Sequence, residues 1–184
     1  MKKITPAFVI GIVLILILII ITFIYYATAT NKIKPEIQNP IKNMENKTQI
    51  TEIVIEPEHL SYLLNEMGTY KLHNPPMSSN TPKINLRVDE QEFKAEVENT
   101  YTKVEKGSWE NPDIKIVTER SEVIEAITST KIQEYMKTSV ASGKTSIELV
   151  AGYTELFSKG YLALYQDLTG KSFTGSVIRI FAQG

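Results

Sequence analysis

The sequence predicts an α+β domain preceded by a single transmembrane helix. Two observations support this prediction: an unbroken apolar run near the N-terminus, and a mixture of strand-like and helix-like apolar periodicity further along the chain. The 184 residues suit one domain with an appendage, and the 42% hydrophobic content excludes a disordered chain. We expect a mainly antiparallel sheet of about five strands with helices on one face.

The composition also excludes several classes of chemistry. The chain has no cysteine, which excludes disulfides, thiolate metal sites and cysteine nucleophiles. Its two histidines argue against histidine-rich metal or triad chemistry. The net charge of −1 argues against nucleic acid as a partner, because phosphate binding needs a basic face. We therefore expect no metal, no cofactor and no nucleic acid.

Residues 1–27 are expected to form an N-terminal membrane anchor. The stretch 7–27 is almost wholly apolar and holds no charged residue, and about 20 such residues in a helix span a bilayer. A cleaved signal peptide is the alternative, since residues 27–29 have the small-x-small form of a cleavage site that would end at Ala29. The apolar stretch exceeds the roughly 7–15 residues of the apolar region within a signal peptide, which favours an uncleaved anchor in the bilayer.

The lysines around the anchor do not by themselves fix its orientation. Lys2 and Lys3 precede it, whereas Lys32, Lys34 and Lys42 follow it. A very short basic N-terminal tail usually stays inside the cell, so we expect a single-pass protein with an extracytoplasmic domain. A type IV pilin start is disfavoured, because no glycine-aromatic pair precedes the run and no glutamate lies early within it.

Residues 28–49 are expected to be a linker, and residues 50–184 the folded domain. The linker is polar, contains Pro35 and Pro40, and has little periodicity. Setting aside the two lysines of the anchor leaves 18 basic residues against 21 acidic ones, so the remainder has no strong attraction for anionic lipid headgroups.

The strands are predicted from the alternation of apolar and polar residues. Residues 84–88 and 93–98 alternate strictly and flank the charged stretch 89–92, so they predict a hairpin with one buried face. We interpret Asp89, Glu90 and Glu92 as a charged turn and not as a cation site. Further strands are expected at 51–56, 100–104, 114–118, 146–150 and 176–181.

The helices are predicted from apolar residues spaced three and four apart. Residues 57–67 form one helix that Gly68 ends, and two more are expected at 119–128 and 130–140. The strongest helical pattern is 153–168, with the stripe Tyr153, Leu156, Phe157, Gly160, Tyr161, Leu164, Tyr165 and Leu168.

Isolated residues have structural and functional interpretations. We expect His59 and His73 to be solvated surface residues, since no ligand-spaced partner accompanies them. Trp109, the only tryptophan, either caps the core or serves as a lid over an apolar cavity or a foot in the membrane interface. The stripe helix either packs against the sheet or forms one wall of a partly polar cavity, with Gly160 as a notch.

Three stretches resemble the sterol carrier protein type 2 domain, a small α+β lipid-binding fold. They are the hairpin 84–98, the strand and helix at 111–127, and the strand 142–148 followed by the stripe helix. The resemblance covers 57–168 and implies an apolar cavity between the stripe helix and the sheet. The expected lipid-binding residues are Ile147, Leu149, Phe157, Gly160, Tyr161, Leu164 and Tyr165.

Two functions follow from the sequence. The first is a membrane-anchored, non-enzymatic module that holds a lipid or another apolar ligand. The second is a membrane-tethered interaction or scaffold protein of the cell envelope with a filled core. An enzyme is disfavoured because no nucleophile–base pair can be assembled from the sequence. A cavity beside the stripe helix would favour the first function, and a fully packed core would favour the second.

Overall fold

The computed structural model describes residues 11–21, 32–42 and 53–171. The chain divides into two compact units, Met1–Lys32 and Ile33–Gly184. Residues 11–21 of the first unit are helical. Among the described residues, no helix is both long and apolar enough to cross a bilayer. The remainder of the expected anchor, the possible cleavage site and the expected strand 176–181 lie outside the described residues.

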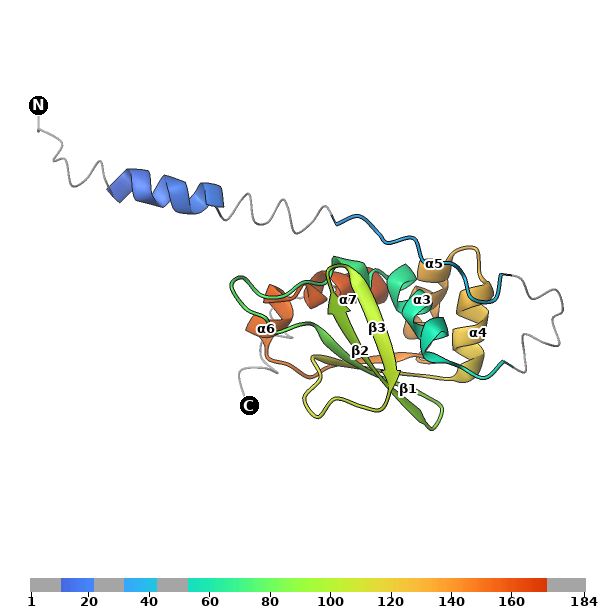
Figure 1. Ribbon diagram of the computed structural model, residues 1–184. Coiled ribbons are helices and arrows are strands. Elements are labelled where there is room, and N and C mark those ends of the chain that lie inside the picture. The colour runs from blue at the N-terminus through green and yellow to red at the C-terminus, as the bar shows by residue number, and fades with distance from the viewer. Residues whose placement is uncertain (1–10, 22–31, 43–52, 172–184) are drawn as a thin grey trace, which may run out of the picture. The chain divides into compact units, whose positions relative to one another are not determined.

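The second unit is built on a five-stranded sheet of order β3-β2-β1-β4-β5 (Figure 1). Neighbouring strands are antiparallel except β1 and β4, which are parallel, so the sheet is mixed. The α+β class is therefore confirmed, with one parallel pairing that the sequence pattern did not predict. The strands are β1 (Lys83–Val88), β2 (Gln91–Glu98), β3 (Tyr101–Lys106), β4 (Ile114–Thr118) and β5 (Ser146–Leu149).

The hairpin of β1 and β2 is tighter than predicted. Gln91 and Glu92 belong to β2 and pair with Val88 and Arg87, so only two residues form the turn. Asp89 takes a positive φ of 51°, which a short-side-chain polar residue tolerates in a hairpin turn. Alternate residues of both strands are buried, as the alternation of the sequence predicts.

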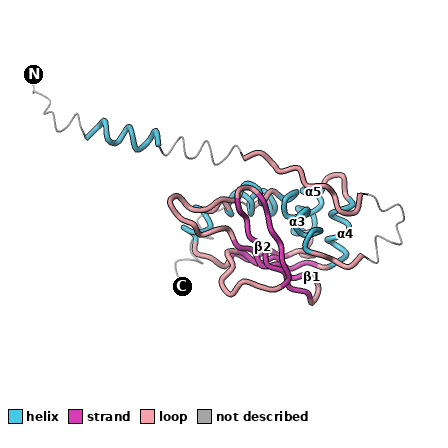
Figure 2. Tube along the Cα trace, viewed as in Figure 1, coloured by secondary structure: helices cyan, strands magenta, loops and turns pink. Residues whose placement is uncertain are grey.

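The helices cover one face of the sheet, which Figure 2 shows as cyan coils above magenta strands. Leu60 and Leu64 from a helix and Phe93 and Ile84 from the sheet are fully buried where the two layers meet. The first helix begins at Pro57 and ends before Gly68, whose φ of 105° closes it in the left-handed conformation. The helices are α3 (Pro57–Met67), the 3₁₀ turn η1 (Thr69–Lys71), α4 (Arg120–Thr128), α5 (Ile132–Ala141), α6 (Tyr153–Ser158) and α7 (Tyr161–Thr169).

The opposite face of the sheet is covered by the loop between β3 and β4. Trp109 lies in this loop, where its backbone N–H and carbonyl bond the Asn85 side chain at 2.8 and 2.9 Å. The ammonium groups of Lys83 and Lys94 lie 4.8 and 4.9 Å from the centre of its ring. Trp109 thus covers the polar face of the sheet, which corrects the expectation of a cap on the core.

The expected strand at 51–56 does not form over residues 53–56. Two of its backbone groups bond side chains instead of a neighbouring strand. Arg120 Nε donates to Ile53 O at 2.8 Å, and Glu56 N–H donates to His59 Nδ1 at 3.1 Å. His59 is therefore a nearly buried residue at the start of α3, which corrects its expected place in solvent.

Part of the expected linker, 28–49, belongs to the folded unit. Ile41 is buried, and Asn65 Nδ2 of α3 donates to Pro35 O at 3.2 Å, so residues 33–42 are attached to the folded unit. Asn39 Nδ2 also donates to Ile127 O at 3.1 Å. We call residues 33–42 the strap.

Candidate functional site

Five of the seven expected lipid-binding residues meet at one place between β4, β5 and α7. We call it the apolar slot. Its lining comes from Ile147, Leu149, Tyr161, Leu164 and Tyr165, together with Met67, Thr69, Ile114, Ile116 and Leu168.

The apolar slot is nearly filled in this conformation. Its free volume is about 10 Å³, which is close to the minimum for one water molecule. Ligand pockets usually measure about 300–1,000 Å³. Ile147, Leu149 and Tyr165 are half-buried, whereas Tyr161 and Leu164 are buried, so the slot reaches the surface along the β5 edge.

Phe157 and Gly160 lie outside the apolar slot, which corrects their expected role as lining residues. The predicted helix 153–168 is two helices, because Gly160 takes a φ of 86° between α6 and α7. A side chain at Gly160 would meet the His73 ring and not the slot. The break turns Phe157 outward, where it is 60% exposed and stacks on Tyr153.

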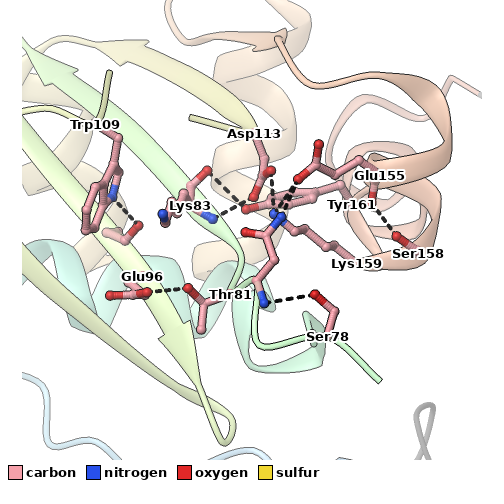
Figure 3. Close-up of polar contacts among 12 residues, drawn as sticks. Ser78, Thr81, Lys83, Glu96, Trp109, Asp113, Glu155, Ser158, Lys159 and Tyr161 are labelled. Carbon is pink, nitrogen blue, oxygen red and sulfur yellow. Dashed lines mark hydrogen bonds and ion pairs between the residues drawn. The ribbon is translucent and has the colours of Figure 1, made fainter. Parts of the chain in front are cut away.

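A buried ion-pair cluster lies beside the apolar slot (Figure 3). Lys159 Nζ lies 2.7 Å from Asp113 Oδ1 and 2.9 Å from Glu155 Oε1. The Lys159 side chain is only 1% exposed, so two carboxylates compensate a charge that water cannot reach. The pKa of Glu155 is lowered chiefly by its hydrogen bond from Lys159.

Backbone geometry fixes Asp113 at the start of β4. Its N–H donates to Lys83 O at 2.8 Å, and its Oδ2 accepts the Lys83 N–H at 2.6 Å. Its carbonyl accepts the N–H groups of Val150 and Ala151 just after β5. One aspartate therefore ties β1, β4 and the chain leaving β5 to the Lys159 ammonium.

Tyr161 belongs to both places. Its ring lines the apolar slot, and its hydroxyl donates at 3.2 Å to Lys83 O, which also accepts the N–H of Asp113 in the ion-pair cluster. Burial, followed by the negative charge of Asp113, raises the pKa of Tyr161 well above its usual value. A tyrosine hydroxyl is protonated at neutral pH in any case, and here it donates to Lys83 O.

A second cavity of about 310 Å³ opens above the ion-pair cluster. We call it the polar pocket. Besides Val150 and Ala151, its lining includes the polar residues Asn80, Lys83, Asn111, Asp113, Glu155 and Lys159.

Sequence reasoning missed the ion-pair cluster, although one local signal for it existed. Glu155 and Lys159 are four residues apart in the order that stabilises a helix, and this spacing predicts their pairing. The contact of Lys159 with Asp113 spans 46 positions and has no sequence signal. Helical spacing of apolar residues predicts the elements of this region, and such a pattern gives no indication that Lys159 is buried.

A second buried carboxylate, Glu122 in α4, is held by neighbouring side chains. Tyr135 O–H donates to its Oε2 at 3.0 Å, and Lys144 Nζ donates to its Oε1 at 2.8 Å. Burial alone would raise the pKa of Glu122, but hydrogen bonds from Lys144, Ser139 and Tyr135 outweigh it and lower the pKa. Tyr135 lies in α5 and Lys144 in the loop that follows it, so these contacts join α4 to α5, and we interpret the cluster as structural.

His73 is half-buried beside Gly160, and its backbone N–H donates to Lys159 O at 3.2 Å. It therefore supports the α6–α7 break, which corrects its expected place in solvent. Over residues 11–21, 32–42 and 53–171, no group of three or more His, Asp or Glu side chains is placed to hold a metal ion.

No family model and no curated protein matches the chain. Among solved structures, the chain is similar to the stereoselective inverting sec-alkylsulfatase Pisa1 from Pseudomonas sp., with 14% identity and a TM-score of 0.31 over 42% of this chain and 12% of that one. It is also similar to UbiJ-SCP2, described as a ubiquinone synthesis protein, with 10% identity and a TM-score of 0.32 over 64% of this chain and 85% of that one. Because both TM-scores are below 0.5, membership of the sterol carrier fold stays a hypothesis.

Proposed function

We propose that this protein is a membrane-attached, non-enzymatic module that binds a lipid or another apolar ligand in the apolar slot, with its domain outside the cytoplasm. The observation that carries the proposal is the slot itself. Aliphatic and aromatic side chains line it, and it reaches the surface along one edge of the sheet. The hydroxyls of Thr69 and Tyr161 are already bonded to Thr102 Oγ1 and Lys83 O, so neither requires water in the slot.

Ligand entry requires α7 to move away from β4 and β5. The helix is bounded by Gly160 and Gly170, with φ angles of 86° and 67°, and no side chain caps its first turn. Its ion pair from Asp167 to Lys71 is exposed at 3.2 Å and contributes little. Apolar contacts therefore provide most of its attachment, and an apolar ligand can replace such contacts.

The alternative function is an interaction or scaffold module. The free volume of about 10 Å³ favours it, since a filled core leaves the surface to carry the function. Phe157 of α6, which is exposed and stacks on the half-buried Tyr153, would then be part of a partner-binding surface.

Blocking the apolar slot at its entrance separates the two functions. In a protein comprising residues 33–184, Ile147→Trp places a large ring in the entrance and should lower the uptake of a pyrene-labelled alkane at least tenfold. Glu148→Trp is the matched control, because it places the same ring on the same strand but on the other face of the sheet. Wild-type protein that takes up no probe would favour the scaffold function. Uptake by Ile147→Trp equal to the wild type would place the binding site elsewhere.

A further inference from the structure

The apolar slot and the polar pocket adjoin each other across Tyr161. Asp113 lines the pocket and the next residue, Ile114, lines the slot; likewise Leu149 lines the slot and the next residue, Val150, lines the pocket. Val150 is 40% exposed, so both places reach the surface at the same end of β5. One extended molecule lying along this end would contact both.

The polar pocket has hydrogen-bonding capacity beyond that of the ion-pair cluster. Asn80 and Asn111 are exposed at its rim, and each carries an amide that can both donate and accept. Asn80 Nδ2 donates to Glu155 Oε1 at 2.8 Å, which orients that amide toward the pocket. A volume of about 310 Å³ is sufficient for a small polar group.

The ion-pair cluster that lines the polar pocket holds two carboxylates and one ammonium, so its net charge is −1. Lys159 lies between Asp113 and Glu155, so its ammonium is already compensated. The Lys83 ammonium lies 4.8 Å from the centre of the Trp109 ring, on the outer face of the sheet. An anionic group would therefore be repelled by the excess carboxylate of the cluster, and a cationic group would compete with Lys159 for Glu155.

We infer that the ligand is an amphiphile whose uncharged, hydroxyl- or amide-bearing polar group binds in the polar pocket while its apolar chain occupies the apolar slot. The inference rests on the proposed function, since it assigns the chain to the same slot. The amides of Asn80 and Asn111 would bind the uncharged group, and the ion-pair cluster would keep charged groups out.

Photolabelling of the full chain tests this assignment. The protein is mixed with phosphatidylcholine vesicles that carry a trace of a diazirine-bearing monoacylglycerol or of the fatty acid with the same acyl chain. Adducts are mapped by proteolysis and mass spectrometry. The neutral probe should label residues 147–168, which contribute to both the apolar slot and the polar pocket, roughly fivefold more than the fatty acid. A fivefold difference corresponds to about one net hydrogen bond.

Two variants locate the preference. The double variant Asn80→Ala with Asn111→Ala should reduce the preference to within about twofold while leaving fatty-acid labelling unchanged, which also shows that the variant is folded. Gln91→Ala removes an exposed amide from the distant hairpin and should leave the preference intact.

The outcomes distinguish the inference from the function on which it rests. Equal labelling by both probes, or a preference that survives in the double variant, overturns the inference and leaves the apolar-ligand function standing. A preference for the fatty acid also overturns it. Absence of labelling by either probe over residues 33–171 overturns the proposed function itself.

Discussion

Removal of the buried ammonium of Lys159 should lower the free energy of unfolding by about 3–5 kcal/mol. Lys159→Met keeps the length of the side chain but leaves the Asp113 carboxylate, whose side chain is 4% exposed, without its ion pair. Asp113 would retain the backbone N–H of Lys83 at 2.6 Å, which does not neutralise its charge. Glu155 is 39% exposed and can be rehydrated, so most of the cost comes from Asp113.

A second substitution separates the lost charge from lost packing. In the Lys159→Met background, Asp113→Asn replaces the unpaired carboxylate with a neutral amide and should recover about 2 kcal/mol, so the two changes should not be additive. Urea unfolding followed by the fluorescence of Trp109, the only tryptophan, measures both variants. A cost below about 1 kcal/mol for Lys159→Met, or no recovery in the double variant, would refute a compensated buried charge.

Three further perturbations follow from the strap, the second carboxylate and the helix break. A protein of residues 33–184 should have a free energy of unfolding about 2–3 kcal/mol higher than one of residues 43–184, because the strap contributes the buried side chain of Ile41. Equal urea midpoints of the two proteins would contradict this. The folded-state pKa of Glu122 is lowered, so its stabilising contribution is present above the unfolded pKa of about 4.3 and is lost as the pH falls through the folded pKa. Glu122→Gln should therefore weaken the dependence of the free energy of unfolding on pH in this acidic range. An unchanged pH dependence would contradict the lowered pKa. Gly160→Ala should lower the free energy of unfolding by about 1 kcal/mol, because alanine is strained at a φ of 86°. Gly143→Ala, at a φ of 78°, should have a similar effect. A stabilising effect of Gly160→Ala would show that Gly160 does not break the helix.

Local sequence patterns predicted both ends of two elements, α3 and β4. Pro57 and Gly68 bound α3 where the sequence places its ends, and β4 matches its predicted range. Strict alternation predicted the buried face of β1 and β2 because that face follows from the two-residue period of a strand. The apolar slot could also be anticipated in part, since Tyr161 and Leu164 follow helical spacing and Ile147 and Leu149 follow strand spacing.

The remaining features depend on contacts that spacing does not encode. The sequence pattern around Gly160 is equally compatible with a small residue inside one continuous helix and with a break between two helices. Only the φ of 86° in the structure distinguishes the two. The prolines of the strap predicted a linker, because the pattern gives no sign that Ile41 has a place to be buried. The parallel pairing of β1 and β4 requires the loop around Trp109 to cross the outer face, and such crossings depend on topology.

The filled state of the apolar slot sets a minimum size for any ligand. If α7 moves away, Tyr161, Leu164 and Leu168 lose their burial at about 1.5–3 kcal/mol each, and the hydrogen bond from Tyr161 to Lys83 O breaks. The total cost is roughly 5–10 kcal/mol. Each buried methylene of a ligand returns about 0.8 kcal/mol, so about ten are needed before binding becomes favourable. In monoacylglycerol photoprobes of increasing chain length, labelling of residues 147–168 should be negligible at about six carbons and should rise steeply above about ten. Labelling that increases evenly from the shortest chain would show that no closed slot has to be opened.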